Sequence, residues 1–232
     1  MTMIADNLHA VRARIAQACT LAGRPVDTVQ LLAVSKTFGP DAVQQAFDAG
    51  QRAFGENYIQ EAVEKIAVLA ALPIEWHCIG PIQSNKTRLV AEHFQWAHTV
   101  DRLKIAQRLS EQRPAHLPPL QVCIQVNVDG GSTKSGVLPE EALALARAVA
   151  ALPRLQLRGL MCIPEPAPDF VAACAVFTRA RGLFDAINAA GLTLDTLSMG
   201  MSADVDAAVA SGSTLVRVGS AIFGARSYPT AA

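Results

Sequence analysis

The run Val29-Gln-Leu-Leu-Ala-Val-Ser-Lys36, followed by the turn Thr37-Phe-Gly-Pro40, decides how this chain folds. Its Val and Leu content, and the Gly-Pro that bounds it, predict a strand of a parallel sheet that is buried on both faces. Lys36 closes this strand at its carboxyl end. Such a lysine either snorkels to solvent, or lies close enough to the core that its charged form is disfavoured, which leaves a Schiff-base nucleophile.

The rest of the chain repeats this pattern, because short β-branched runs alternate with longer Ala-rich amphipathic stretches. Eight strands each followed by a helix predict an α/β protein, a single (β/α)₈ TIM barrel over residues 1–232, rather than a doubly wound open sheet. An extra amino-terminal helix is expected over residues 3–22. Strands are expected near 29–35, 52–55, 75–79, 95–99, 120–127, 155–161, 194–198 and 214–218. Helices are expected near 40–49, 57–71, 84–92, 102–112, 139–151, 169–190 and 203–211, with a short turn near 220–225.

Composition narrows the class of protein. The 232 residues are 51% hydrophobic and only 5% aromatic, which suits helices packed on a buried parallel sheet and argues against a β-sandwich. The formal net charge is zero, and no basic run is present, so neither nucleic acid nor a membrane is an expected partner. Five scattered cysteines without a C-x-x-C pattern predict buried reduced thiols, and the histidines lack metal-ligand spacing. No leader or spanning segment is found, so the expected location is cytoplasmic.

Two predicted loops have the chemistry of a phosphate site. Ser202 follows the seventh strand, and Gly219-Ser220 follows the eighth, each at the expected start of a helix, while Gly200 lets backbone approach a ligand closely. Free amides at helix starts, beside small hydroxyl residues, bind phosphate, and this position is a recurring one in such barrels. Alternatively, Ser202 and Ser220 only cap their helices. The two loops together favour phosphate.

Arg217 and His77 are the other polar residues of interest. Arg217 lies on the apolar run Thr214-Leu-Val-Arg-Val-Gly219, so a side chain pointing into the barrel needs a ligand or a partner such as a carboxylate at the barrel rim. Beside the ring nitrogen of a phosphorylated pyridine, it would oppose protonation of the ring and weaken it as an electron sink. His77, on the third strand, is assigned to the pocket lining, although a general base and a satisfied core histidine are alternatives.

Taken in order, the motifs of this chain resemble those of the pyridoxal phosphate homeostasis proteins. The resemblance runs the full length of the chain, and so many matches in the same order do not arise by chance. The matching segments are Ala33-Val-Ser-Lys-Thr37, Phe54-Gly-Glu-Asn-Tyr58, Trp76-His-Cys-Ile-Gly-Pro-Ile-Gln-Ser-Asn-Lys86, Ser135-Gly136, Arg158-Gly-Leu-Met161, Leu197-Ser-Met-Gly-Met-Ser202 and Val216-Arg-Val-Gly-Ser-Ala-Ile-Phe-Gly-Ala-Arg226.

The resemblance implies a monomeric or weakly associating barrel, similar to the barrel domain of alanine racemases, that holds pyridoxal 5'-phosphate (PLP) covalently. It also implies a departure, because a second lysine often follows the anchor by two positions in bacterial relatives, and Phe38 stands there in this chain. Eight residues receive cofactor-binding roles: Lys36 for the Schiff base, Ser202, Gly219 and Ser220 for the phosphate, Arg217 for the pyridine nitrogen, and Asn57, His77 and Met161 for the ring.

The function implied by the resemblance is PLP (vitamin B6) homeostasis, in which the cofactor is buffered or delivered to apo-enzymes without a catalytic reaction. The alternative is a PLP-dependent, racemase-like enzyme. Racemisation needs an acid/base group on each face of the substrate adduct, and in alanine racemases the second is a tyrosine from an additional β domain. Here that domain is not expected, and the tyrosines are Tyr58 and Tyr228. A cofactor-free aldolase fits Lys36 but not the ordered motifs.

Overall fold

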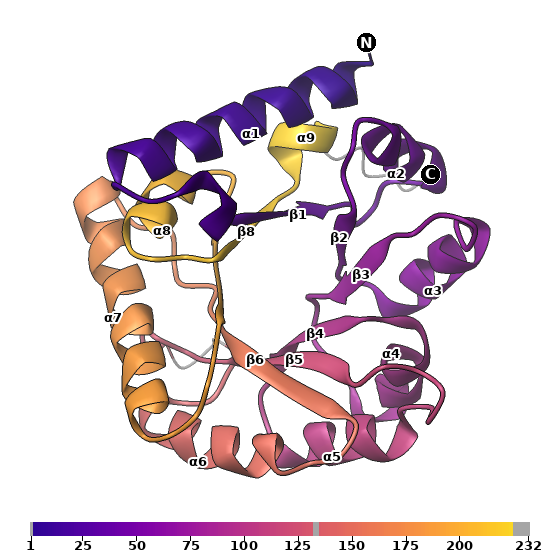
Figure 1. The fold of residues 1–232 in the computed structure, drawn as a ribbon, viewed down its shortest axis with the longest axis vertical. Helices are drawn as coiled ribbons and strands as arrows, with labels where there is room; N and C mark the ends of the chain where they lie inside the picture. The colour runs from indigo at the N-terminus through magenta and orange to yellow at the C-terminus, as the bar shows by residue number, and fades with distance from the viewer. Residues whose placement is uncertain (1, 132–134, 225–232) are drawn as a thin grey trace, which may run out of the picture.

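A closed eight-stranded barrel forms the centre of the protein in a computed structural model that describes residues 2–131 and 135–224 (Figure 1). Each strand is parallel to the next, and β1 also pairs with β8, with Leu31 opposite Val216, which closes the ring. The predicted barrel is therefore confirmed. The strands are β1 (Gln30–Val34), β2 (Ala53–Glu56), β3 (Glu75–Cys78), β4 (Trp96–Val100), β5 (Leu120–Gln125), β6 (Leu155–Met161), β7 (Thr196–Met201) and β8 (Leu215–Val218).

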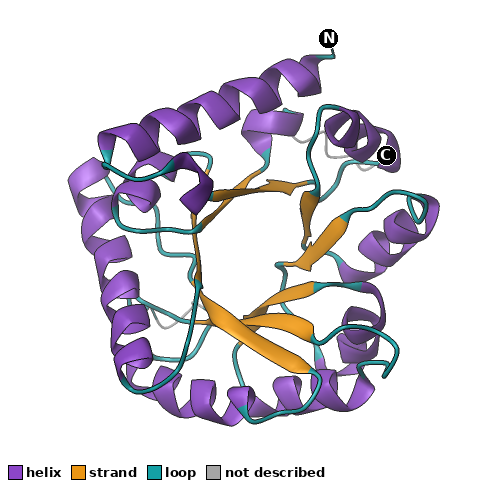
Figure 2. Ribbon diagram, viewed as in Figure 1, coloured by secondary structure: helices purple, strands orange, loops and turns teal. Residues whose placement is uncertain are grey.

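Helices surround this ring of strands (Figure 2). The expected amino-terminal helix is present and packs against the last two helices and α2. A short 3₁₀ helix, η1 (Val26–Thr28), was not expected, and a second one, η2 (Ser84–Lys86), forms the first turn of the helix expected near 84–92. The α-helices are α1 (Met3–Leu21), α2 (Pro40–Asp48), α3 (Ile59–Val68), α4 (Thr87–His93), α5 (Leu103–Gln112), α6 (Pro139–Ala150), α7 (Phe170–Ala189), α8 (Val205–Ala210) and α9 (Ser220–Phe223).

Several helix starts follow from local sequence. Helices α2 and α6 begin at Pro40 and Pro139, because proline at the first helical position needs no hydrogen-bond acceptor and has its φ already set. Helix α7 begins after Asp169, whose carboxylate accepts the backbone N–H of Ala172 at 2.8 Å. Such N-caps satisfy one of the amides that a helix start leaves without a partner.

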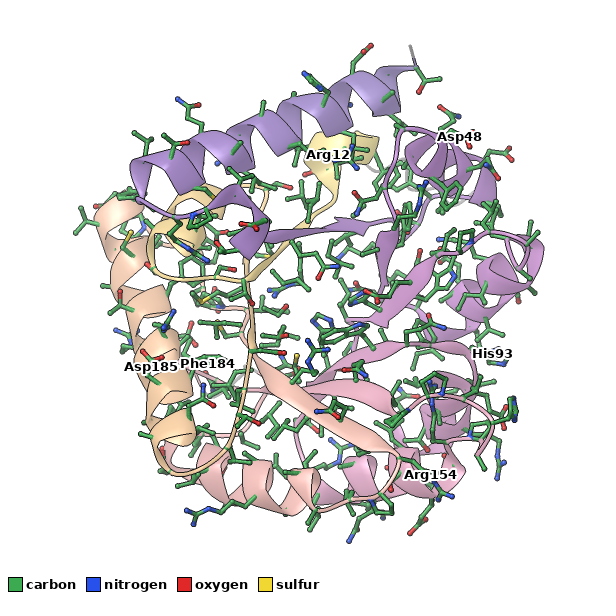
Figure 3. All side chains as sticks on the ribbon, viewed as in Figure 1. Arg12, Asp48, His93, Arg154, Phe184 and Asp185 are labelled. Carbon is green, nitrogen blue, oxygen red and sulfur yellow. The ribbon has the colours of Figure 1, made fainter. Side chains whose placement is uncertain are left out.

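The hydrophobic core has two layers, one outside the barrel and one inside. Alternate strand residues, such as Ala33 and Phe54, pack with the helices in the outer layer. The intervening residues point into the barrel, where Leu32 and Leu215 belong to one small cluster and Trp96 and its neighbours to another. Figure 3 shows side chains filling the ring of strands. This filled interior is typical of a packed barrel core, so a ligand site belongs at an end of the barrel.

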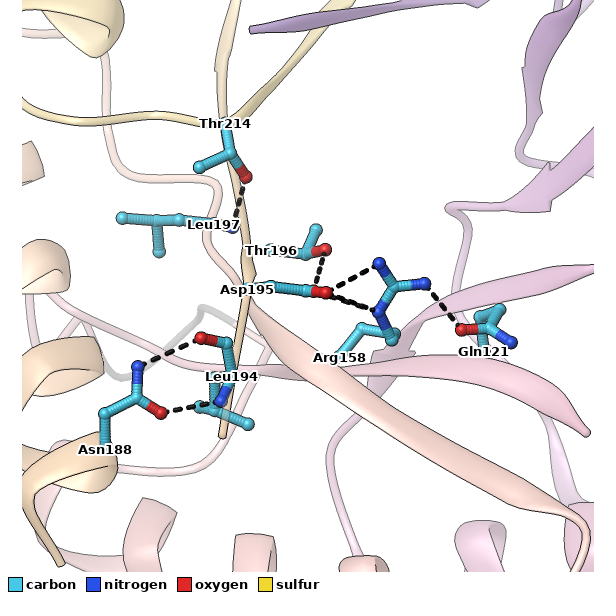
Figure 4. Close-up of polar contacts among 8 residues, drawn as sticks. All are labelled: Gln121, Arg158, Asn188, Leu194, Asp195, Thr196, Leu197 and Thr214. Carbon is cyan, nitrogen blue, oxygen red and sulfur yellow. Dashed lines mark hydrogen bonds and ion pairs between the residues drawn. The ribbon is translucent and has the colours of Figure 1, made fainter. Parts of the chain in front are cut away.

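A polar network ties the strands together at the amino-terminal end of the barrel (Figure 4). The Arg158 guanidinium binds the Asp195 carboxylate at 2.7 Å and also donates to Gln121 Oε1 at 2.7 Å. It also lies over the ring of Trp96, 4.9 Å from the centroid. These contacts join β5, β6 and the start of β7 at the end opposite to the carboxyl ends of the strands.

Candidate functional site

A cavity of about 270 Å³ lies at the carboxyl ends of the strands. Residues from β1, β2, β7 and β8, or from the loops that follow them, line it. Six of the eight residues assigned from the resemblance are among them: Lys36, Asn57, Ser202, Arg217, Gly219 and Ser220. The chain therefore brings an amine, two hydroxyls, an amide and a guanidinium around one space.

Lys36 lies two residues after β1, and the backbone on both sides of it is restrained. Thr37 has a φ of 68°, a region that is rare for a β-branched residue. Its N–H donates to Glu61 Oε1 on α3 at 3.1 Å. Such strained conformations persist only where the surroundings hold them, and they occur often at functional sites.

A buried ion pair, Glu56 with Lys65, holds the residue before Lys36. The two side chains are 1% and 3% exposed, and the Lys65 Nζ donates to Glu56 Oε1 at 2.6 Å. Lys65 also donates to the Ser35 carbonyl at 3.1 Å, and the Ser35 hydroxyl donates to Glu56 Oε1 at 2.6 Å. Burial raises the pKa of Glu56, and the Lys65 ammonium opposes that shift. Sequence reasoning did not identify this pair, although Lys65 falls on the buried face of α3 with Ile59.

The two serines of the predicted phosphate loops do not cap helices. Helix α8 begins after Asp204, not after Ser202 as expected, and Asp204 Oδ1 accepts the Met201 N–H at 2.5 Å. Ser220 is the first residue of α9, where no side chain makes a capping hydrogen bond. The hydroxyls of Ser202 and Ser220 instead face each other, 3.5 Å apart. The capping alternative is therefore wrong, and both residues line the cavity.

Arg217 is buried at the inner wall of the cavity, and it is 4% exposed. Its guanidinium donates to Ser198 Oγ at 2.7 Å and to the Cys162 carbonyl at 2.9 Å. Burial lowers its pKa. No carboxylate of the described residues pairs with it, contrary to the alternative considered above, and both of its hydrogen-bond partners are neutral groups. A buried cation in this position favours an electron-rich or anionic group in the adjacent space.

Asn57 brings an unpaired oxygen to the same region. Its Oδ1 is buried and has no hydrogen-bond partner among the described residues. The backbone of Asn57 is held against Gly80, where an added Cβ would lie 2.0 Å from the Asn57 carbonyl oxygen. Buried polar atoms are normally hydrogen-bonded. The amine, the two hydroxyls and the guanidinium of this cavity are the donors that a phosphorylated ligand such as PLP needs, and the Asn57 oxygen offers one acceptor beside them.

His77 and Met161 do not line this cavity. Both are buried inside the barrel, with no exposed surface. The His77 ring stacks on Trp96 at 5.2 Å, and Met161 packs with Trp96 and Cys123. Neither is among the residues that line the cavity, so their assigned contact with a ring stays a prediction. His77 is the satisfied core histidine that was considered as an alternative.

We expect the buried histidines to make stability depend on pH. Burial lowers the pKa of His77, although the Glu75 carboxylate opposes this shift, and burial also lowers the pKa of His98, where the Arg217 cation acts in the same direction. A histidine that stays neutral when folded but is protonated when unfolded loses stability as the pH falls below about 6.5. Each such histidine should cost about 1.4 kcal/mol between pH 7.5 and 5.5.

Urea unfolding at the two pH values measures this effect. The variant His98→Gln should lose about 1.4 kcal/mol less than the wild type over the same interval. The comparison between the two proteins matters, because the raised pKa of the Glu56 carboxyl acts in the opposite direction in both of them. Equal pH dependence of the wild type and the variant would show that His98 is not held neutral.

Other chemistries find little support. All five cysteines are free, and four are buried as expected, whereas Cys174 is only half-buried. Burial raises the pKa of Cys78, Cys123 and Cys162 to about 12 each. Within residues 2–131 and 135–224, no cluster of three metal-ligating side chains is found. Over the same residues, none of the helices is both long and apolar enough to cross a bilayer.

Known proteins share this barrel and much of its sequence. The family model for the alanine racemase N-terminal domain matches residues 7–227. A pyridoxal phosphate homeostasis protein of Pseudomonas aeruginosa is 61% identical over 228 residues, which cover 98% of each chain. PipY of Synechococcus elongatus, solved with PLP bound, is 37% identical, with a TM-score of 0.83 over 95% of this chain and all of that one.

An alanine racemase of Clostridium difficile shows the same fold at greater distance. It has a TM-score of 0.72 and 16% identity, and the match covers 97% of this chain and 58% of the racemase. At this identity the likeness concerns the fold alone. The family is decided by the nearer matches, which extend over nearly the whole of both chains. The chain therefore belongs to the alanine racemase N-terminal domain family and, within it, to the pyridoxal phosphate homeostasis proteins.

Proposed function

We propose that the chain binds PLP in the cavity at the carboxyl ends of the strands and takes part in PLP homeostasis. The observation that carries this proposal is that Lys36, Arg217 and two serines that cap no helix line one cavity of about 270 Å³. The names of the relatives and the PLP-bound PipY support it.

In this proposal, the link between protein and cofactor is a Schiff base on Lys36. The Nζ condenses with the aldehyde of PLP and water leaves, and exchange with another amine reverses the link. Ser202, Ser220 and the backbone at Gly219 hold the phosphate. Arg217 faces the pyridine nitrogen, where a fixed cation keeps the ring unprotonated. PLP supplies an electrophilic aldehyde, and the side chains around it hold and orient it.

The absorbance spectrum tests this link. Protein loaded with PLP should have a band near the violet edge of the visible spectrum, and Lys36→Ala should lose it. Lys86→Ala is the matched control, because Lys86 lines the neighbouring cavity with Asn57 and Tyr58 rather than the cavity with Lys36. After borohydride reduction, the peptide that contains Lys36 should carry the pyridoxyl group. A wild type that PLP leaves colourless would refute the proposal.

We further propose that PLP is stored and delivered to apo-enzymes by a monomer, without turnover. Tyr58 lines the neighbouring cavity of about 480 Å³, not the cavity with Lys36, and Tyr228 lies outside the described residues. Incubation of the loaded protein with D- and L-amino acids, followed by chiral chromatography, tests the racemase alternative. Turnover of about one per second or faster would favour an enzyme. Transfer of PLP to an apo-enzyme, seen as recovered activity of that enzyme, would support delivery.

A further inference from the structure

A continuous line of hydrogen bonds crosses the interior of the barrel from Arg217 to the opposite wall and ends at the amino-terminal mouth. We call these five residues the cross-barrel chain. Four contacts make it: Arg217 Nη1 to Ser198 Oγ at 2.7 Å, Ser198 Oγ to His98 Nδ1 at 3.0 Å, His98 Nε2 to His77 Nδ1 at 2.9 Å, and His77 Nε2 to Glu75 Oε1 at 2.8 Å. Its members come from β8, β7, β4 and β3.

The position of every proton in this chain follows from Arg217. A guanidinium has donors only, so Ser198 Oγ accepts from Arg217, and the hydroxyl proton has His98 Nδ1 as its one acceptor among these five residues. A neutral imidazole has one donor and one acceptor nitrogen, so His98 donates from Nε2 to His77 Nδ1. His77 then donates from Nε2 to the Glu75 carboxylate. All the donors point away from the cavity.

The reverse order of protons also uses all four contacts, but it leaves the Ser198 proton without an acceptor. If His77 were an imidazolium, it would donate to His98 Nε2, and His98 would then donate from Nδ1 to Ser198. The Ser198 hydroxyl, which already accepts from Arg217, would have no acceptor left within the chain. Ser198, His98 and His77 have no exposed surface, so water does not replace the missing partner.

The residues around the cross-barrel chain favour neutral histidines. His77 stacks on Trp96 with an interplanar angle of 8°, and Arg158 covers Trp96 from the amino-terminal side. Two cations, Arg158 and Arg217, thus lie near the two imidazoles. At the mouth, Glu75 is 43% exposed and lines a cavity of about 330 Å³ together with Arg52.

We propose that Ser198, His98 and His77 are positioning residues for Arg217, with Glu75 as the acceptor that ends the chain. They fix the direction of each hydrogen bond behind the guanidinium, so that its remaining N–H groups stay aimed at the PLP cavity. The inference rests on the proposed function. It means that a carboxylate at one end of the barrel helps to determine how tightly the other end holds PLP.

Nitrogen NMR of the PLP-free protein tests the proton order directly. With ¹⁵N-labelled histidine, and with His77→Gln and His98→Gln used for assignment, both rings should appear as neutral Nε2–H tautomers at pH 7.5. An Nδ1–H tautomer in either ring, or an imidazolium at His98, would overturn the inference.

PLP titrations test the positioning role. Ser198→Ala removes the link to Arg217 and should weaken PLP binding about tenfold, whereas Ser198→Thr keeps the hydroxyl and should restore it. Glu75→Leu should weaken binding in the same direction and shift the His77 tautomer, and Glu75→Gln, which keeps an acceptor oxygen, should do neither. Unchanged affinity in Ser198→Ala would contradict the proposal.

A general loss of stability is the competing explanation. Phe177→Leu, a change in the buried face of α7 away from the cavity, should lower the urea midpoint while PLP affinity stays at the wild-type value. If Phe177→Leu loses as much PLP affinity as Ser198→Ala, the cross-barrel chain has only a structural role. A wild type that binds no PLP would refute the proposed function as well, whereas a wrong tautomer refutes this inference alone.

Discussion

Replacing Lys65 with methionine should destabilise the protein by about 3–5 kcal/mol. Lys65 is 3% exposed and provides the cation that Glu56 needs. Its loss would leave a buried carboxylate whose second oxygen, Oε2, already has no partner, and a Ser35 carbonyl without the Lys65 hydrogen bond. Removing one member of a buried pair costs far more than the net value of the pair, because the remaining charge stays in the core. Urea unfolding at pH 7.5 measures the change.

A double-mutant cycle separates the unpaired charge from lost packing. Glu56→Leu combined with Lys65→Met removes both charges, and it should recover most of the stability lost in Lys65→Met. PLP titration of the same variants reports on Lys36, because the pair holds the adjacent Ser35. A single Lys65→Met change that costs less than about 1 kcal/mol would mean that the pair is not buried as described.

Gly200→Ala should be the most damaging small substitution near the phosphate loop, with a cost of about 2–5 kcal/mol. Gly200 has a φ of 96°, which disfavours any residue with a Cβ, and the added Cβ would lie 2.4 Å from the Cβ of Ala208 on α8. Either α8 or the Gly200 backbone must move. Since Ser202 follows two residues later, PLP affinity should fall together with the urea midpoint.

Two variants divide this cost into its causes. Gly191 has a φ of 99° with nothing near the place of its missing Cβ, so Gly191→Ala carries the backbone strain alone and should cost about 1–2 kcal/mol. Ala208→Gly alone should cost about 1 kcal/mol in its helix. In the Gly200→Ala background it should instead restore stability, because it removes the clash. Additive effects of the two changes would show that no clash exists.

The architecture was predictable from the sequence because each strand and helix carries its own signal. The run that ends at Lys36 is apolar over the length of one strand, and comparable runs recur between amphipathic stretches through Val218. In a barrel of parallel strands, the carboxyl ends meet on one face. Residues at those ends, such as Ser202 and Ser220, could therefore be placed in one site without any knowledge of side-chain directions.

Features that depend on where a side chain points, or on how deeply it is buried, were not predictable from the sequence. His77 and Met161 lie on strands that lead to the site, but both side chains are buried and neither lines the cavity, so their contact with a ring stays a prediction. The start of α8 was misplaced because Asp204, two residues beyond Ser202, takes the cap position. Lys65 was missed because a lysine in a helix is normally solvated. Its burial depends on Glu56 of β2, and the sequence does not show that these two side chains meet.

The barrel is closed by the pairing of β1 with β8, and this has a consequence for biosynthesis. Lys36 is made early in translation, whereas Ser220 is made more than 180 residues later. If PLP is held as proposed, a growing polypeptide on the ribosome has the amine but not the phosphate loops, so the complete site forms only after the last strand is made. Bound PLP would then join the first strand to the last and stabilise the native state by mass action. The resistance of the protein to proteolysis should therefore rise with the concentration of free PLP.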